Sequence, residues 1–264
     1  MTRDESSPAM GFAGVIFDVD GVLVDSPHEA AWRESLAELM TGPWQDAAER
    51  SSWSPDAFTS RVYREVLSGK PRHEGALACL EYFEVPDAQQ RESEYAERKQ
   101  TMLLRLIEEA RFDAYADGVR LVMAVRAAGI PVAAASSSKN AHRFLRAIRL
   151  GEFGGGDTSL LDTSLLDVFD ADLSGRDFAK GKPDPEIFLT AAAELGVAPE
   201  RCVVVEDAVS GVQAAKAGAL VALGVARADD EHELARAGAD LVVTSLDDVD
   251  REAFAAGRLE RRAH

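Results

Sequence analysis

An apolar segment that ends in two aspartates and a glycine constrains the fold of this chain more than any other feature. Residues 15–17 read Val-Ile-Phe, and Asp18, Val19, Asp20 and Gly21 follow directly. Alternate residues of a strand lie on one face, so Asp18 and Asp20 can point the same way from the carboxyl end of the strand. Two ionised carboxylates repel each other, and a hard cation such as Mg2+ relieves that repulsion. A strand that simply ends in a polar turn is the alternative interpretation.

Three later segments carry polar groups in similar places. The apolar residues 130–135 lead into a polar run, Ser136, Ser137, Ser138, Lys139 and Asn140. A strand that delivers hydroxyl and backbone N–H groups to the start of a helix forms an anion site. Lys182 stands between a glycine and a proline, and a third apolar run, residues 202–205, ends in Glu206 and Asp207. These are the groups that metal-assisted phosphoryl transfer requires.

Helical and strand patterns alternate in the second half of the chain. We expect strands at residues 130–135, 168–171, 203–205, 220–225 and 241–244, and helices at residues 119–128, 139–150, 184–195, 209–217 and 231–237. Residues 28–110 carry helical patterns, among them residues 30–40, 55–67, 74–84 and 93–110. The sequence therefore predicts an α/β fold, with a Rossmann-like parallel sheet, helices on both faces and ligands at the carboxyl ends of the strands. The helical block is expected to be an inserted all-helical domain, residues 27–114, between core segments 1–26 and 115–264.

The overall composition narrows the class of protein. The chain has 264 residues, a net charge of −17 and a sequence pI of about 4.7, which argue against nucleic acid or an anionic membrane as a partner. Its two cysteines, Cys79 and Cys202, are far apart and make a disulfide framework improbable. There is no signal-peptide pattern and no apolar run of membrane-spanning length. We expect a cytoplasmic, monomeric enzyme with a small phosphorylated substrate.

Together these motifs resemble the haloacid dehalogenase superfamily of phosphotransferases, and within it the beta-phosphoglucomutase-like group. The resemblance covers residues 14–245 and is strongest at residues 17–26, 132–140, 181–193 and 203–218. It implies that Asp18 is the nucleophile, which forms an aspartyl-phosphate, and that Asp20 is the general acid and base. It also implies a Mg2+ ion held by Asp18, Asp207 and the backbone carbonyl of Asp20, with Glu206 contributing through water. For Glu206 and Asp207, the alternative interpretation is a solvated strand end without a metal ion.

The resemblance also assigns the phosphate contacts of the core. Ser136 and Lys182 would hold the transferring phosphoryl group, with Lys182 neutralising charge as it develops. The remaining residues of the polar run, which are Ser137, Ser138, Lys139 and Asn140, are either further phosphate contacts or caps of the next helix. Residues 150–164 contain a glycine triplet and a near-repeat, and we expect a loop insertion there.

Two residues of the helical block are candidates for contact with the substrate or the acid/base group. In the mutases that this chain resembles, a histidine at the place of His28 helps to poise the acid/base aspartate. His28 follows Ser26 more closely than that pattern expects, and a packing or capping histidine is the alternative. Residues 69–74 resemble the substrate loop of the mutases, where Arg72 would clamp the distal phosphate through two hydrogen bonds.

Arg98 and Lys99 form a second basic pair in the helical block. The pair resembles another basic pair in the helical domain of the mutases, and a solvated helix face explains it equally well. His73, His142 and His232 lack metal-ligand spacing and are expected at the surface. The aromatic residues of the block, Trp44, Trp53, Phe58 and Tyr63, are expected to form its hydrophobic core.

Three functions fit these residues. The first is a mutase that moves phosphate between two positions of an aldose phosphate, for which Arg72 supplies the second anion site. The second is a phosphatase in which water attacks the same aspartyl-phosphate. The third is a phosphosugar-binding or sensing protein without turnover, which the intact Asp18, Asp20, Lys182 and Asp207 disfavour.

Overall fold

The chain divides into two compact units. A computed structural model describes residues 11–67, 70–153 and 160–263. The first unit, here the α/β unit, comprises Met1–Ser26 and Asp113–His264, and the second, the helical unit, comprises Pro27–Phe112. The second boundary lies two residues before the one expected at 114/115. The reason is that β3 (Asp113–Ala114) pairs antiparallel with β2 (Val24–Asp25) and so belongs to the α/β unit.

In the described part of the chain, six parallel strands form the sheet of the α/β unit, in the order β5-β4-β1-β6-β7-β8. Their bounds are β1 Gly14–Phe17, β4 Val132–Ala134, β5 Ala171–Asp172, β6 Cys202–Glu206, β7 Val221–Val225 and β8 Leu241–Val243. Phe17 of β1 is in register with Ala134 of β4 and with Val205 of β6. The residues that follow these three strands therefore meet at one edge of the sheet.

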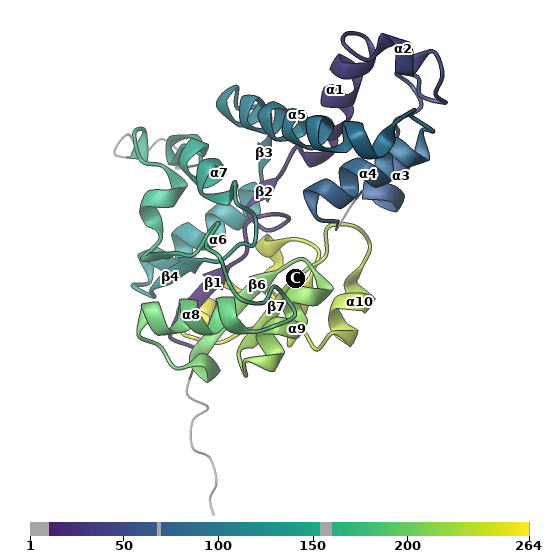
Figure 1. Ribbon diagram of the computed structural model, residues 1–264. Coiled ribbons are helices and arrows are strands. Elements are labelled where there is room, and N and C mark those ends of the chain that lie inside the picture. The colour runs from purple at the N-terminus through teal and green to yellow at the C-terminus, as the bar shows by residue number, and fades with distance from the viewer. Residues whose placement is uncertain (1–10, 68–69, 154–159, 264) are drawn as a thin grey trace, which may run out of the picture. The chain divides into compact units, whose positions relative to one another are not determined.

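Helices cover both faces of this sheet. The chain runs from β1 to β4 and β5 on one side of β1, then returns to β6, β7 and β8 on the other side. Among these strands, Figure 1 labels β1, β4, β6 and β7. Right-handed connections place α6 and α7 on one face and α8, α9 and α10 on the opposite face. The bounds are α6 Ala116–Ala127, α7 Ala141–Ala147, α8 Glu186–Leu195, α9 Val209–Ala217, α10 Glu231–Arg236 and, near the end of the chain, α11 Arg251–Ala255. This reversal beside β1 makes a topological switch point, where such sheets bind ligands.

The central strands are buried on both faces. On one face, Ile16 and Val204 pack with Ile187 and Phe188 of α8 and Val212 of α9. Strands covered on both sides read as continuous apolar runs rather than as alternating ones, and residues 14–17 and 202–205 have that pattern.

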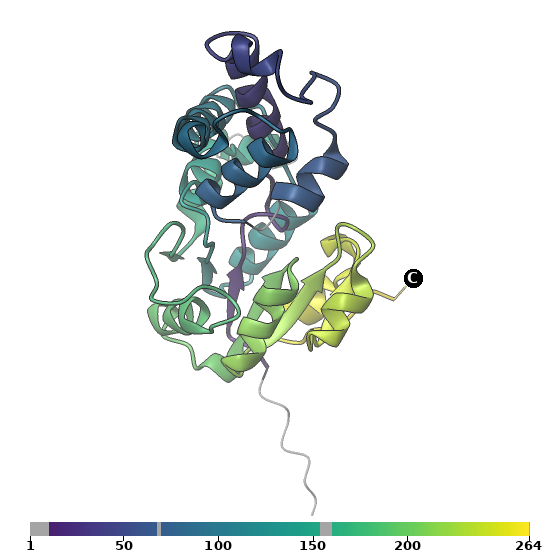
Figure 2. The same ribbon diagram turned by 45° about the vertical axis from the view of Figure 1, so that its right-hand side comes forward.

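The helical unit is built from the helices between β2 and β3 (Figures 1 and 2). They are α1 His28–Met40, α2 Gln45–Ala48, α3 Ser60–Val62 continued by the π-helical turn Tyr63–Leu67, α4 Arg72–Tyr82 and α5 Ala88–Glu108. Trp44 and Phe58 are buried in its core, and Trp53 and Tyr63 pack against that core. The aromatic residues thus lie where the sequence predicted.

Some predicted elements differ from the structure. The strand predicted at 168–171 is wrong in its first half, because Leu165–Val168 form a 3-10 turn capped by Ser164 and only Ala171–Asp172 pair with β4. Helical structure near 55–67 begins at Ser60, where Thr59 accepts a hydrogen bond from the Val62 N–H. In the predicted insertion, a bridge between Arg149 and Ser164 joins the two ends, and residues 154–159 lie outside the described residues. No helix in the described segments is both long and apolar enough to cross a membrane.

Candidate active site

Asp18 and Asp20 follow β1 at the switch point of the sheet. Asp18 is buried, and its backbone N–H donates to Val205 O over 3.0 Å, which continues the β1–β6 ladder by one residue. Gly21 has a φ of +76°, a conformation that favours glycine, and lets the chain turn directly after Asp20. A Cβ at Gly21 would lie 1.9 Å from Asp207 Oδ2. The turn therefore needs glycine both for its backbone angle and for the close approach of the Asp207 carboxylate.

Lys182 connects two of the candidate carboxylates. Its ammonium Nζ lies 2.6 Å from Asp18 Oδ1 and also donates to Glu206 Oε1. The lysine side chain is 10% exposed, and Nζ lies 4.8 Å from the centre of the Phe188 ring. Burial acts to lower the pKa of Lys182, but the two carboxylates outweigh it and raise the pKa above its ordinary value. The structure thus brings Asp18, Lys182 and Glu206 together across 188 residues of sequence, from residue 18 to residue 206.

Glu206 and Asp207 stand at the carboxyl end of β6. Glu206 is 1% exposed, and its Oε2 accepts a hydrogen bond of 2.8 Å from the Ala208 N–H. A Cβ at Gly211 would lie 1.8 Å from Glu206 Oε1, so the first turn of α9 is shaped around this carboxylate. Both observations exclude the alternative of a solvated strand end for Glu206, which is an internal, oriented group.

The carboxylates exceed the positive charge that Lys182 supplies. Burial raises the pKa of Asp18 to about 7, and the Glu206 charge adds to that rise while Lys182 opposes it. Burial, followed by the charges of Glu206 and Asp18, raises the pKa of Asp207 to about 9. Such shifts mean that full ionisation of the cluster is unfavourable in the protein alone. A bound cation would remove that cost.

The donor set fits a Mg2+ ion rather than an ion enclosed by protein. Among the described residues, no three carboxylate, histidine or cysteine side chains converge closely enough to hold a metal ion. Mg2+ is usually held by one or two carboxylates and keeps several of its waters. Asp18 and Asp207, with the backbone carbonyl of Asp20, are sufficient for that mode. The missing side chain of Gly21 leaves the space through which the Asp207 carboxylate approaches this turn.

The polar run after β4 is a compact turn. Ser136 is 2% exposed, and its Oγ accepts from the Ser138 N–H over 3.1 Å. Asn140 is buried directly before α7, and Lys139 is largely exposed, with its ammonium paired to Asp177. Asn140 stands at the N-cap position of α7, but within the described residues its side chain makes no capping hydrogen bond, so the helix caps and the phosphate contacts predicted for this run both remain predictions.

A cleft of about 180 Å³ nevertheless joins this run to Lys182. Its lining includes Ser137, Lys139 and Lys182, together with Arg176, Asp177, Phe178, Lys180, Gly181 and Ile187. The cleft brings four basic side chains to one place, and each of them is paired with a carboxylate of the protein.

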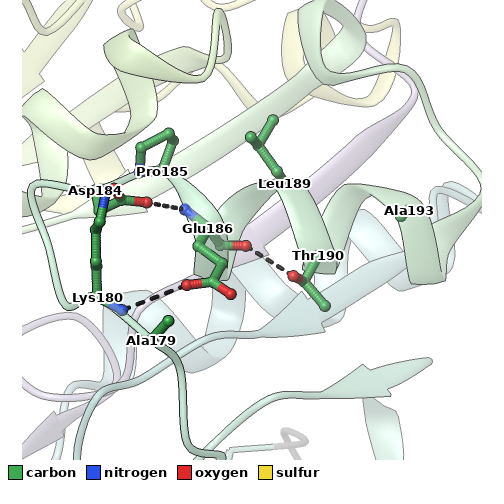
Figure 3. A pocket seen from close by; sticks show the side chains of 8 residues that line it. All are labelled: Ala179, Lys180, Asp184, Pro185, Glu186, Leu189, Thr190 and Ala193. Atoms are coloured by element: carbon green, nitrogen blue, oxygen red, sulfur yellow. Dashed lines mark hydrogen bonds and ion pairs between the residues drawn. The ribbon is translucent and has the colours of Figure 1, made fainter.

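A larger hollow, of about 500 Å³, lies around the start of α8 (Figure 3). Figure 3 shows its polar side chains bonded locally: Asp184 Oδ1 accepts from the Glu186 N–H over 3.1 Å, and Thr190 Oγ1 donates to Glu186 O over 2.8 Å. All of its lining residues are exposed or half-buried. The volume of a hollow therefore does not identify the active site, and the buried acids beside Lys182 are the better candidate for it.

In the helical unit, His28 contacts a buried lysine. His28 is the first residue of α1, and its Nδ1 lies 3.2 Å from Lys99 Nζ. Lys99 is 6% exposed, and its Nζ lies 5.1 Å from the centre of the Trp32 ring. Burial, and then the Lys99 charge, lower the pKa of His28 to about 3. The histidine is therefore neutral and accepts from the lysine.

The burial of Lys99 decides whether Arg98 and Lys99 lie on a solvated helix face, but it does not decide the role of His28. Arg98 is exposed, as a solvated helix face predicts, but Lys99 is not. A signal was present in the sequence, because Lys99 shares its helical face with the apolar Tyr95, Met102 and Leu103. Arg72 begins α4 and donates to Gln100 Oε1 over 3.1 Å, while Gly69 of the same predicted loop lies outside the described residues. The roles of His28 and Arg72 at the site remain predictions.

Comparisons with known proteins agree with this geometry. The family model of haloacid dehalogenase-like hydrolases matches residues 12–218. The chain is 33% identical over 250 residues to the beta-phosphoglucomutase of Mycobacterium bovis, with 88% of each chain covered. It is 31% identical to a phosphorylated carbohydrates phosphatase of Thermotoga maritima, with 87% of this chain and 93% of that protein covered. The structure of a beta-phosphoglucomutase from a hyperthermophilic Pyrococcus superposes with a TM-score of 0.65 at 27% identity, covering 92% of this chain and 97% of that one.

The matched segment includes the acids after β1 and β6, the polar run after β4 and Lys182. The parallel sheet, the position of these groups at its carboxyl edge and the relatives all lead to the same class of enzyme, a phosphotransferase or phosphatase. The chain belongs to the haloacid dehalogenase-like hydrolases.

Proposed function

We propose that this enzyme moves a phosphoryl group on a phosphorylated sugar through an aspartyl-phosphate on Asp18, in the manner of a beta-phosphoglucomutase. The observation that carries the proposal is the contact of Lys182 Nζ with both Asp18 and Glu206 at the ends of neighbouring strands. This contact places a fixed positive charge beside the atom that would bond to phosphorus. The beta-phosphoglucomutase of Mycobacterium bovis, at 33% identity, supports the substrate class.

In the first step, an Asp18 carboxylate oxygen attacks phosphorus and the bond from phosphorus to the sugar oxygen breaks. Asp20 donates a proton to that leaving oxygen, which departs as a neutral hydroxyl. Lys182 and Ser136 hold the oxygens of the transferring group, and the lysine charge offsets the negative charge that develops on them. Buried Glu206 keeps the lysine oriented toward Asp18.

Mg2+ bound by Asp18, Asp207 and the Asp20 carbonyl would supply a further positive charge at the phosphoryl oxygens. Glu206 would contribute through water. The unfavourable ionisation of Asp18 and Asp207 described above supports this assignment.

In the second step, a second oxygen nucleophile attacks the aspartyl-phosphate and releases Asp18, while Asp20 takes the proton of the attacking hydroxyl. In a mutase the nucleophile is a hydroxyl of a bound sugar phosphate, so a sugar bisphosphate forms. The bisphosphate must then reorient before it returns its other phosphate group to Asp18. Arg72, at the start of α4, is the proposed contact for the phosphate that is not transferred.

The deciding experiment measures turnover of beta-glucose 1-phosphate with added Mg2+, with and without a trace of glucose 1,6-bisphosphate. A mutase forms glucose 6-phosphate faster when the bisphosphate is present, because it primes Asp18. Release of inorganic phosphate without isomerisation would contradict the mutase proposal and leave the phosphatase.

The phosphatase is the second candidate, because the phosphorylated carbohydrates phosphatase of Thermotoga maritima is 31% identical over nearly the same span. In that case water attacks the aspartyl-phosphate and every turnover releases phosphate. A binding protein without catalysis would show neither product with any hexose phosphate.

A further inference from the structure

Arg227 connects the turn that carries the proposed acid/base group to a buried carboxylate. It follows β7, and its guanidinium Nε donates to Gly21 O over 2.9 Å while Nη2 donates to Val22 O over 3.4 Å. The same guanidinium forms a two-point ion pair with Asp117, at 2.9 Å from Nη1 and 3.1 Å from Nη2. The Arg227 side chain is 17% exposed.

The two backbone carbonyls belong to the turn that carries Asp20. Within the turn, the N–H groups of Leu23 and Val24 donate to Val19 O, and the Gly21 N–H donates to Val24 O over 2.8 Å. These bonds use the carbonyls of Val19 and Val24, and the carbonyls of Gly21 and Val22 are held by Arg227 instead. Hydrogen bonds from a charged donor are roughly twice as strong as neutral ones.

Asp117, at the start of α6, anchors the arginine from the other side. Its carboxylate also accepts from the Gly118 N–H at 2.9 Å, Ser245 Oγ at 3.1 Å and the Leu246 N–H at 2.8 Å. Burial alone would raise the pKa of Asp117, but these hydrogen bonds and that of Arg227 hold it below its ordinary value. The carboxylate is thus a fixed, ionised support.

Tyr115 and Gly118, at the start of α6, also contact Arg227 or the turn that carries Asp20. The Arg227 guanidinium lies 4.0 Å from the centre of the Tyr115 ring, and the Tyr115 N–H donates to Leu23 O over 2.9 Å. A Cβ at Gly118 would lie 2.4 Å from Val22 O, so the backbone of α6 touches the turn directly. The turn is therefore held from the segment that enters α6 and from the segment after β7.

We propose that Arg227 is a positioning residue for Asp20, because it holds the carbonyls of Gly21 and Val22 and thereby fixes the turn that directs the Asp20 carboxyl. The inference rests on the proposed acid/base function of Asp20. A purely structural ion pair would stabilise the fold and leave the reaction unchanged.

The chain offers a matched control in Arg120. Arg120 lies on α6, the helix that carries Asp117, and like Arg227 it makes a two-point ion pair, here with Asp247, whose Oδ1 accepts from Arg120 Nε over 3.2 Å. Asp247 belongs to the same 245–248 segment that supports Asp117, but within the described residues the Arg120 pair makes no hydrogen bond with the turn that carries Asp20. Arg120→Ala therefore removes a comparable structural pair without releasing the turn.

The test compares Arg227→Ala, Arg120→Ala and Asp20→Asn on a series of substituted phenyl phosphates with graded leaving groups. A general acid matters most for poor leaving groups, so a misdirected Asp20 costs more on phenyl phosphate than on p-nitrophenyl phosphate. For Arg227→Ala we expect kcat on phenyl phosphate to fall about 10- to 100-fold, as for a catalytic group displaced by about 1 Å, with little change in KM. Added guanidinium chloride should restore part of this loss, and equal sodium chloride should not.

The outcomes separate the inference from the function on which it rests. If Asp20→Asn is steeply sensitive to the leaving group and Arg227→Ala is not, the positioning role of Arg227 is wrong. If Asp20→Asn shows no such sensitivity, the acid role of Asp20 itself is wrong. If Arg227→Ala does not fold, Arg227→Lys carries the test: it keeps the charge but not the planar array of donors, and it should show the same dependence to a smaller extent. Equal sensitivity of Arg227→Lys and Arg120→Ala would overturn the proposal.

Discussion

The α/β unit and the helical unit carry opposite electrostatic problems. In the α/β unit, Asp18 and Asp207 have raised pKa values because buried acids crowd around Lys182. In the helical unit, His28 has a lowered pKa because it is removed from water and contacts Lys99. In the α/β unit burial disfavours the negative charge of these two carboxylates, and in the helical unit it disfavours the positive charge of the histidine.

This difference indicates which of the two units would gain from a bound cation. A buried cluster with more carboxylates than cations is stabilised by one, whereas a histidine that is held neutral beside a lysine is not. The following predictions test the comparison, from the largest expected effect to the smallest.

Asp18→Asn should abolish turnover while the fold survives. The amide cannot form an acyl phosphate, and the loss of a nucleophile costs at least about a thousandfold in rate. Steady-state assays and circular dichroism check the two parts. Asp46→Asn, which changes an exposed carboxylate of the helical unit, is the control and should keep full activity. A residual rate above a few per cent in Asp18→Asn would show that another group is the nucleophile.

Arg72→Ala should separate a mutase from a phosphatase. A charge-assisted, two-point phosphate contact is worth about 1.5–3 kcal/mol, or roughly one to two powers of ten in binding. Isomerisation of hexose 1-phosphate should fall by that factor, while hydrolysis of a small aryl phosphate, which has no second phosphate, should hardly change. Arg98→Ala, an exposed arginine of α5, is the comparison. Equal, small effects on both reactions would count against the mutase.

Asp207→Asn should reverse its effect on stability when Mg2+ is added. Asp207 has a folded-state pKa of about 9 against an ordinary value of 3.8, so the folded protein binds more protons than the unfolded chain and loses stability as the pH rises through this window. At about pH 8 without metal, the variant should be more stable than the wild type. With Mg2+ at about 100 times its Kd, the wild type gains about 2.7 kcal/mol and the variant gains much less. Scanning calorimetry measures both, and an unchanged order would mean that Asp207 is not a ligand.

His28 should make the helical unit sensitive to acid. Its folded-state pKa of about 3 lies below the ordinary 6.5, so the unfolded chain binds the extra proton and stability falls as the pH drops through this window. The loss amounts to at most about 2 kcal/mol at about pH 5. Tryptophan fluorescence reports it selectively, because Trp32, Trp44 and Trp53 all lie in the helical unit. His28→Gln should remove this dependence, and exposed His232→Gln should not.

Much of the structure of the α/β unit could be predicted from the sequence, because the patterns that indicate its strands and turns extend over only a few residues. An apolar strand followed by Asp18, Asp20 and Gly21 identifies both the end of β1 and the class of chemistry. The parallel sheet follows from the alternation of strand and helix patterns, and parallel strands place their carboxyl ends at one edge. The weakest prediction was the strand at 168–171, where an edge strand of two residues has little pattern to read.

The contacts that define the site depend on how distant segments meet. Lys182 and Asp18 are 164 residues apart, and only the register of β1 with β6 and the packing of α8 bring the ammonium to the carboxylate. The burial of Lys99 depends on which face of α5 packs against α1. Local patterns identified both lysines but did not determine their partners.

By itself, therefore, the sequence determined the fold class, the family and the residue types at each strand end, because hydrophobic periodicity and turn chemistry act over a few residues. Tertiary structure alone decided which charges face one another: Lys182 between Asp18 and Glu206, Lys99 against His28, and Arg227 between Asp117 and the Gly21 carbonyl. The physical reason is that the pKa and orientation of a charged group depend on burial and on neighbours within a few ångströms. Those neighbours come from segments that are separated in the chain and adjacent only in the folded protein.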